Sequence, residues 1–215
     1  MRNLNFSENE FYHVYNRGVD KRSIFIKNVD VDRFFECMQI LNRETSIGSI
    51  RDLPKHPLSG KEESKLVKFI AYCLNPNHFH FILEQVAERG IERFMHKLGM
   101  GHSKYINAKY KRSGALFQGS FKATHIDSNE YLLHASAYVN LNNRVHGYRH
   151  GVSGTFVRSS WLEYTGRTER EFCDKSIILE QFKSRGRYKK FAEETLKDIV
   201  NRKILLKELE DDRIL

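Results

Sequence analysis

The sequence predicts an α+β protein with a ferredoxin-like, split βαβ core, in which an antiparallel sheet packs against helices, followed by a helical C-terminal appendage. Segments with strand-like and helix-like patterns follow one another in the order strand, helix, strand, strand, helix, strand, helix. The 215 residues, 40% of them hydrophobic, are enough for one substantial core. The second and third strands are separated by a short Pro-Asn turn, which favours an antiparallel hairpin.

Each element is indicated by a local pattern. Alternating aromatic and polar residues indicate strands, and apolar residues three and four apart indicate helices. The helix after residue 126 has the clearest start, because Asp127 stands three residues before Glu130 as in a capping box. The expected elements are a strand at 11–15, a helix at 29–41, a surface loop at 42–65, strands at 66–74 and 78–84 around a turn at 75–77, a helix at 86–110, a basic loop at 109–119, a strand at 121–126, a helix from 127 to 144, a polar loop containing Trp161, and helices at 174–184 and 188–209.

These elements suggest one main domain. Residues 1–150 contain the whole predicted βαβ pattern, whereas residues 151–215 are a charged helical appendage whose role the sequence does not indicate.

Composition narrows the class of partner. Lysine and arginine outnumber acidic residues 36 to 27, and the resulting net charge of +9 favours a polyanionic partner. The three cysteines, Cys37, Cys73 and Cys173, have neither disulfide-framework nor zinc-site spacing. The N-terminus lacks the apolar core of a signal peptide, and no apolar run is long enough to cross a membrane. We therefore expect a cytoplasmic protein that is not membrane-bound.

Two histidines and a tyrosine suggest the chemistry. His78 and His80 alternate along one strand, so both imidazoles emerge on the same face and can share a cation. On the helix that begins near residue 127, Tyr138 and Asn142 are four residues apart and lie one turn from each other, with His134 a turn earlier. A HxH pair alone is a weak signal, and most tyrosines are structural. The spacing of Tyr138 and Asn142 is what favours a site.

Such a set is suited to covalent phosphodiester cleavage. A tyrosine hydroxyl with a pKa of about 10 is a poor nucleophile at neutral pH, and a cation that polarises the phosphate compensates for this. Two imidazoles and an amide oxygen can hold the cation and leave positions for phosphate oxygens. Mg²⁺ or Mn²⁺ is expected, although two histidines would also accept zinc.

Four stretches in this order resemble the HUH single-tyrosine transposases (the IS200-like transposase domain), and in particular their REP-associated branch. The resemblance extends over roughly residues 8–150 and is carried by Tyr12–Gly18, Cys73–His80, Gly114–Lys122 and Tyr131–Asn142. It implies a metal site at His78, His80 and Asn142, and attack by Tyr138 that leaves a 5′-phosphotyrosine link.

The resemblance also implies a target and a location. It implies hairpin-bearing single-stranded DNA, such as repetitive extragenic palindromes or element ends, and a role in DNA transposition or recombination at the bacterial nucleoid in the cytoplasm. A monomer and a homodimer with a shared site both remain open. The sequence departs from the family at two positions, since Asn143 replaces a usual proline and Asn75 a usual methionine.

Basic residues interleaved with aromatic ones are candidates for DNA contact. Lysine and arginine neutralise phosphates, while tyrosine and phenylalanine rings stack on bases. Arg17 is the preferred single contact, because it precedes a glycine turn in a stretch that resembles the family. The expected DNA-binding residues are Arg17, Lys21, Arg22, Lys104, Lys109, Arg112 and Lys122.

Two other functions fit the same sequence. A domesticated DNA- or RNA-binding protein would keep the fold and the basic face without catalysis. A metal hydrolase would use the cation to activate water and would leave Tyr138 structural. Covalent protein–DNA linkage separates both from the single-tyrosine mechanism.

Overall fold

The computed structural model describes residues 4–45, 64–148, 156–169 and 171–211. Its elements are β1 (Phe11–Arg17), η1 (Val19–Lys21), α1 (Asn28–Ile40), β2 (Val67–Asn75), β3 (His78–Gln85), α2 (Gly90–Lys109), β4 (Lys122–Ile126), α3 (Asn129–Val145), β5 (Arg158–Ser159), α4 (Trp161–Tyr164), α5 (Ser176–Leu179) and α6 (Arg185–Asp211). The strands form one five-stranded sheet in the order β4-β1-β3-β2-β5, and every neighbouring pair is antiparallel. The predicted α+β fold is confirmed.

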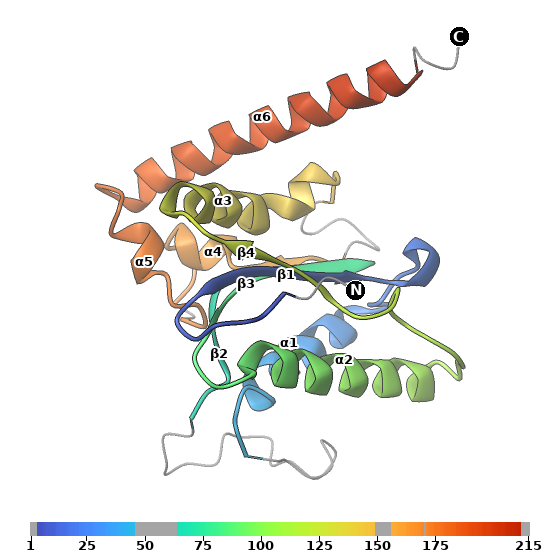
Figure 1. Ribbon diagram of the computed structural model, residues 1–215. Coiled ribbons are helices and arrows are strands. Elements are labelled where there is room, and N and C mark those ends of the chain that lie inside the picture. The colour runs from blue at the N-terminus through green and yellow to red at the C-terminus, as the bar shows by residue number, and fades with distance from the viewer. Residues whose placement is uncertain (1–3, 46–63, 149–155, 170, 212–215) are drawn as a thin grey trace.

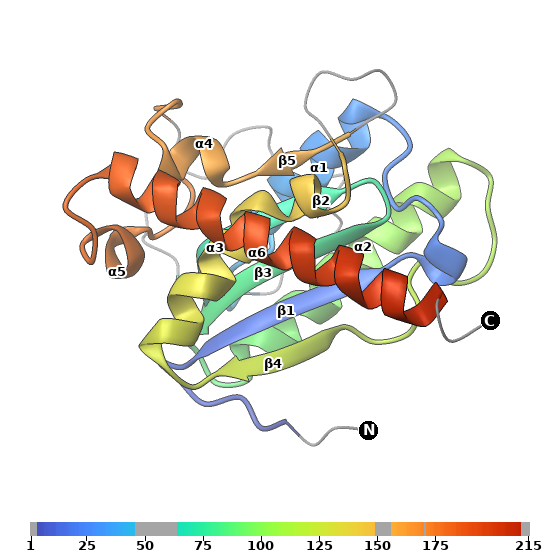
Figure 2. The same cartoon turned by 90° about the horizontal axis from the view of Figure 1, so that it is seen from above.

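The first four strands form two interleaved split βαβ units. β1 and β2 run parallel on either side of β3, and β3 and β4 run parallel on either side of β1. α1 and α2 cover one face of the sheet, while α3 and then α6 cover the other (Figure 1). Seen from above, α6 crosses over α3 and the central strands (Figure 2). The sheet is therefore buried on both faces.

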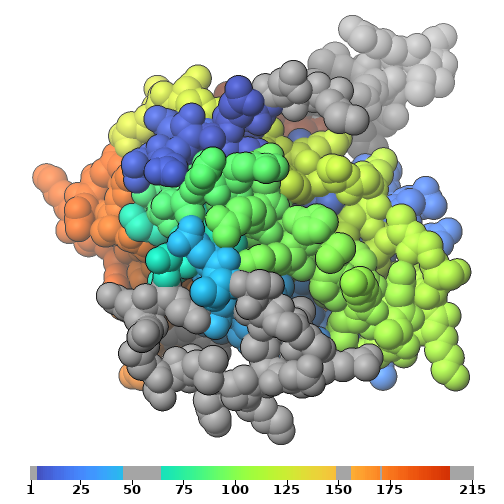
Figure 3. All heavy atoms as spheres, turned by 60° about the horizontal axis from the view of Figure 1, so that its bottom comes forward, coloured from blue at the N-terminus to red at the C-terminus, as the bar shows by residue number. Residues whose placement is uncertain are grey.

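The alternation of side chains divides the interior into two cores. Tyr12, Val14, Phe79 and Phe81 pack towards α1 and α2, on the side of the molecule seen in Figure 3. Their strand neighbours point the opposite way, towards α3, where Ile82 joins the second core. This alternation turns the predicted histidines of β3 towards α3.

A β-bulge in β2 determines which face of the sheet the side chains of its last residues point to. The register of β2 against β3 shifts between Phe69 and Ala71, and both Ile70 and Ala71 belong to the second core. Cys73 then packs in that core as well. Asn75, two residues further on, points to the same face as Cys73.

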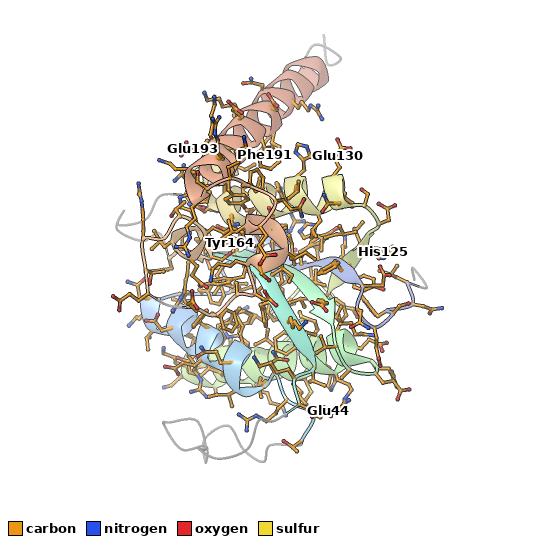
Figure 4. The ribbon with its side chains drawn as sticks, turned by 90° about the vertical axis from the view of Figure 1, so that its left-hand side faces the viewer. Glu44, His125, Glu130, Tyr164, Phe191 and Glu193 are labelled. Carbon is orange, nitrogen blue, oxygen red and sulfur yellow. The ribbon has the colours of Figure 1, made fainter. Side chains whose placement is uncertain are left out.

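The C-terminal residues pack against the rest of the protein. β5 pairs with the edge strand β2, and Tyr164 of α4 and Phe191 of α6 both lie on the α3 side of the sheet (Figure 4). The Tyr188 hydroxyl lies 2.8 Å from Asn140 Nδ2, and Ser160 Oγ donates to Asn140 Oδ1 at 2.6 Å. These bonds join α6, α3 and the segment before α4. The predicted boundary at residue 150 lies outside the described residues.

Several predicted boundaries were wrong. Helix α3 is capped by Ser128, whose Oγ accepts from the Tyr131 N–H at 3.2 Å, so Asp127 lies outside it. Helix α2 begins at Gly90 because Arg89 has a left-handed backbone with φ of 53°. The helix expected at 174–184 is only Ser176–Leu179, and β5 and α4 were not predicted. Most of the loop expected at 42–65 lies outside the described residues. Within the described residues, no helix is both long and apolar enough to cross a membrane.

A buried carboxylate joins α1 to α2. Asp30 is fully buried, and its Oδ2 accepts from the backbone N–H groups of Ile26 and Lys27 at 3.0 and 2.8 Å. Lys109 Nζ lies 2.6 Å from Asp30 Oδ1, and the Tyr105 and Tyr110 hydroxyls also donate to this carboxylate. Burial alone would raise the pKa of Asp30, but these hydrogen bonds outweigh it and lower the pKa to about 2.

We expect Asp30→Asn to lower the free energy of unfolding by about 2 kcal/mol at pH 7. The folded pKa is below the unfolded value of about 3.9, so this stability is fully present above that value. It should be lost as the pH falls towards 2. Urea unfolding at pH 7 and at pH 3 measures both effects. Asp32→Asn, which removes an exposed carboxylate 3.0 Å from Arg158, is the matched control and should cost less than about 1 kcal/mol. An equal loss of unfolding free energy in the two variants would contradict a stabilising role for the buried Asp30 carboxylate.

Candidate functional site

The predicted histidines meet the end of β2 across a tight hairpin. Asn75 and His78 are direct partners in the β2–β3 register, so only Pro76 and Asn77 form the turn. Facing side chains at such a pair lie about 5 Å apart at Cβ. His78 and His80 are both buried and point to the α3 side, with ring centroids 5.2 Å apart.

Hydrogen bonding determines which nitrogen of His78 is free. Asn77 Nδ2 donates to the Lys21 carbonyl oxygen at 3.0 Å, so the Asn77 Oδ1 faces His78 Nδ1, 2.6 Å away. His78 Nδ1 therefore carries the proton and donates to that oxygen. Burial lowers the pKa of His78, which keeps the ring neutral. The Nε2 lone pair is thus available as a metal ligand.

Asn142 presents a second ligand atom to the same place. The Asn142 side chain is fully buried on α3, and its Oδ1 lies 3.0 Å from His78 Nε2. Two lone-pair atoms at this distance need a shared donor or cation between them. Asn75 Nδ2 makes contacts of 3.0 Å to His78 Nε2 and 2.8 Å to Asn142 Oδ1. No cluster of three or more His, Cys, Asp and Glu side chains among the described residues is placed to hold a metal. Any site here thus needs amide ligands, and the donor set fits a divalent cation.

His80 is held by two residues of β1. Its Nδ1 lies 2.8 Å from His13 Nε2, and the Tyr15 ring stacks on its ring at a centroid distance of 5.4 Å. Burial lowers the pKa of His13 to about 4 and holds the pKa of His80 well below its usual value. Both rings are therefore neutral at pH 7. If His80 Nδ1 donates to His13, its Nε2 is free to bind a cation.

Tyr138 lies beside the histidines in the same chain. Its ring meets the edges of His80 and His13 at centroid distances of 5.5 and 5.8 Å. Burial raises the pKa of Tyr138, and the neighbouring Asn142 amide opposes this effect. The Asn142 Nδ2 is buried and has no hydrogen-bond partner among the described residues. The phenol is consequently protonated at neutral pH and needs positive charge on its target to react.

A basic pocket of about 490 Å³ opens beside His78 and His80. It combines cationic, amide and aromatic side chains, a lining suited to phosphates and bases. Gly18 allows the η1 loop to close over the pocket edge, because a Cβ at Gly18 would lie 2.0 Å from the Arg22 carbonyl oxygen. The lining residues are Tyr15, Asn16, Arg17, Lys21, Asn77, His78, His80, Gln118, Lys122, His146 and Tyr148.

The predicted DNA-binding residues do not all lie at this pocket. Arg17, Lys21 and Lys122 line it, whereas exposed Arg22 pairs with Asp20 at 3.7 Å. Lys104 and Lys109 belong to α2, on the other side of the sheet from α3 (Figure 1). Lys109 is held by Asp30. Arg112 follows α2 and donates its backbone N–H to the Asn107 carbonyl oxygen.

One neighbour expected at the site is elsewhere, and others were missed. His134 contacts Phe191 and Thr195 of α6, because each step of four residues turns the helix about 40° further than a full turn. His13, Asn75 and His146 were not predicted to lie here. His146 follows α3 and its ring lies 4.7 Å from that of His78. The alternation of side chains along β1 could have indicated that His13 points to the same face as the site. The register of the hairpin could have indicated that Asn75 pairs with His78.

Comparison with known proteins identifies the family. A solved REP-associated tyrosine transposase bound to a REP hairpin has the same fold at 14% sequence identity, with a TM-score of 0.50 over 80% of this chain and 88% of that one. No curated protein matches the sequence. Residues 11–142, which include the hairpin histidines, Tyr138 and Asn142, match the "Transposase IS200 like" family. The chain therefore belongs to the IS200-like transposase family, and it is an enzyme of the transposase class.

Proposed function

We propose that this enzyme is a single-tyrosine endonuclease and strand-transferase that acts on single-stranded DNA through a 5′-phosphotyrosine intermediate. One observation carries the proposal. Within a single chain, Tyr138 meets His80 while Asn142 meets His78, at the edge of a basic pocket. No second chain is required to complete this set, so we propose an active site built in cis, in a monomer or in each half of a homodimer.

His78, His80 and Asn142 are the residues that would hold the cation. IS200-like transposases are metal-dependent in general. A bound Mg²⁺ or Mn²⁺ would polarise the scissile phosphate and offset charge that develops on it. The amide oxygen of Asn142 favours these hard cations, although the imidazoles would also accept zinc. Asn77 holds His78 in the ligating tautomer, and His13 would do the same for His80 by accepting from its Nδ1.

Tyr138 performs the covalent step. Its hydroxyl oxygen forms a bond to the phosphorus, and the bond from phosphorus to the 3′ oxygen breaks. The proton lost by the phenol balances the proton gained by the 3′ hydroxyl, so the step consumes no co-reactant. Attack by a 3′ hydroxyl on the phosphotyrosine reverses the step and joins strands. Asn142 lies one turn from Tyr138 on α3, and its buried Nδ2, which has no hydrogen-bond partner among the described residues, is available to orient the phenol.

The pocket residues Arg17, Lys21 and Lys122 are the strongest candidates for DNA contact. We expect Arg17→Ala to weaken binding of single-stranded DNA by about tenfold and to reduce the salt slope by about one. Lys104→Ala, on α2, is the matched control and should change binding less than twofold. Fluorescence anisotropy at several salt concentrations measures both. A loss in Lys104→Ala without a loss in Arg17→Ala would assign the DNA to the α2 side, with Lys109 and Arg112.

We infer that the substrate is hairpin-bearing DNA, such as a palindromic repeat, and that the enzyme acts at the bacterial nucleoid in the cytoplasm. The structural neighbour was solved on a REP hairpin, and the basic, partly aromatic pocket of this chain suits an unpaired strand beside such a stem. Residues after 156 support the site indirectly, because Tyr188 and Ser160 fix Asn140 on the helix that carries Tyr138.

The test is incubation of the protein with end-labelled, hairpin-bearing single-stranded DNA and Mn²⁺, followed by denaturing gels. With the label at the 3′ end, a labelled band that runs above the mass of the free protein and disappears with chelator is the expected result. Cleavage without a linked band would replace the proposal with a metal hydrolase that uses water. Binding without cleavage would replace it with a non-catalytic nucleic-acid-binding protein.

A further inference from the structure

Asn75 occupies a position in the site that the proposed ligand set does not explain. It is the last residue of β2, is fully buried, and faces His78 directly across the hairpin. Its terminal amide touches both proposed ligand atoms, His78 Nε2 at 3.0 Å and Asn142 Oδ1 at 2.8 Å. An amide nitrogen has two hydrogens and can donate to two acceptors, but here both acceptors are proposed ligand atoms. Asn75 instead lies on the atoms that would bind the cation.

The three atoms form a triangle with nearly equal sides. The third side, from His78 Nε2 to Asn142 Oδ1, is also 3.0 Å. An octahedral cation with ligands at about 2.1 Å has neighbouring ligand atoms about 3.0 Å apart, so three such atoms can occupy one face of the octahedron. The corner at Asn75 thus has the spacing of a ligand.

The amide of Asn75 can present oxygen at this corner. A half-turn about the last side-chain bond exchanges its oxygen and nitrogen at nearly the same positions. Before any such half-turn, as the structure stands, the Asn75 oxygen faces Cys73. The Cys73 Sγ lies 3.7 Å from it, which is at most a weak hydrogen bond. The half-turn therefore gives up little on the Cys73 side. On the other side it replaces two hydrogen bonds with a metal–oxygen bond.

We infer that Asn75 is a further ligand of the divalent cation, which it binds through its side-chain oxygen on one face with His78 Nε2 and Asn142 Oδ1. This inference rests on the proposed metal-dependent function. A second amide oxygen makes the ligand set harder, and it biases the site towards Mg²⁺ and Mn²⁺ rather than Zn²⁺.

The experiment compares Mn²⁺ binding by wild type, Asn75→Leu and Asn75→Asp. Titration followed by the electron paramagnetic resonance of free Mn²⁺ gives affinity, and deuterium modulation of bound Mn²⁺ in D₂O counts its water ligands. Asn75→Leu should bind at least about tenfold more weakly and gain one water, while Asn75→Asp should bind as tightly as wild type or more tightly. Thermal unfolding without metal confirms that each variant folds.

Asn143→Leu is the matched control, because Asn143 is also a buried asparagine but donates its amide to the Tyr148 carbonyl oxygen at 3.0 Å. Its Mn²⁺ affinity and water count should equal those of wild type. Unchanged or tighter binding by Asn75→Leu would overturn the inference and leave the role of Tyr138 intact. Weaker binding with an unchanged water count would also overturn it, since Asn75 would then only position the ligands. Failure of wild type to bind Mn²⁺ would overturn this inference together with the metal dependence of the proposed function.

Discussion

Tyr138→Phe is expected to abolish the covalent protein–DNA product, with a loss of about four orders of magnitude or more. The substitution removes one oxygen atom and keeps the ring that contacts His13 and His80. Fold, cation binding and DNA binding should therefore be unchanged. Denaturing gels with labelled hairpin DNA measure the linked product, and anisotropy of the same DNA measures binding.

Two other tyrosines provide controls for this result. Tyr131 lies on the same helix and is exposed, so Tyr131→Phe should retain the linked product. Tyr15 lines the pocket and stacks on His80 at a centroid distance of 5.4 Å, whereas Tyr148, the other phenol in the pocket lining, lies 6.5 Å from the His78 ring. Tyr15 is therefore the more informative alternative nucleophile. Linked product that persists in Tyr138→Phe and disappears in Tyr15→Phe would move the nucleophile from α3 to β1.

Most of the fold could be predicted from the sequence, because most of its elements have a periodicity of their own. Period two in β1 and β3 and period 3.6 in α1 and α3 follow directly from backbone geometry. The order of the strands follows from the split βαβ rule. By contrast, β5 has only two residues, Arg158 and Ser159, and such a strand exists because the edge of β2 is available to pair with. Local sequence cannot show that partner.

The sequence grouped the candidate site residues only where they share one element. His78 and His80 share β3, and Tyr138 and Asn142 share α3. Asn75 was placed in a three-residue turn, but a two-residue turn at Pro76 and Asn77 makes it the partner of His78. His13 meets His80 because β1 lies beside β3, which depends on the topology of the whole sheet.

Contacts between elements also explain why His134 lies away from the site. They explain as well why the C-terminal residues, predicted to be an appendage, pack against the core. His134 precedes Tyr138 by four residues, yet the accumulated rotation turns it to α6. Helix α6 has a weakly amphipathic, charged sequence, but Tyr188 and Ala192 are fully buried against α3. A charged helix can cover a core when a few large residues on one stripe supply the contact.

His78→Ala is expected to weaken Mn²⁺ binding by at least about 100-fold and to reduce the linked product to the level seen with chelator. The substitution removes the Nε2 lone pair that lies 3.0 Å from Asn142 Oδ1, and it leaves His80 as the single imidazole beside the two amides. Calorimetric titration with Mn²⁺ measures the first effect, and the gel assay measures the second.

His146→Ala is the informative control, because the His146 ring lies 4.7 Å from the His78 ring and lines the same pocket. His146 makes no contact with Asn142 or Asn75 in the described hydrogen bonding, so its loss should change Mn²⁺ affinity less than tenfold. His134→Ala should change nothing at the site. Comparable losses in His78→Ala and His146→Ala would place the cation on the outer side of the His78 ring, at Nδ1. That outcome would require Asn77 to give up its hydrogen bond, and it would contradict the tautomer on which the Nε2 site depends.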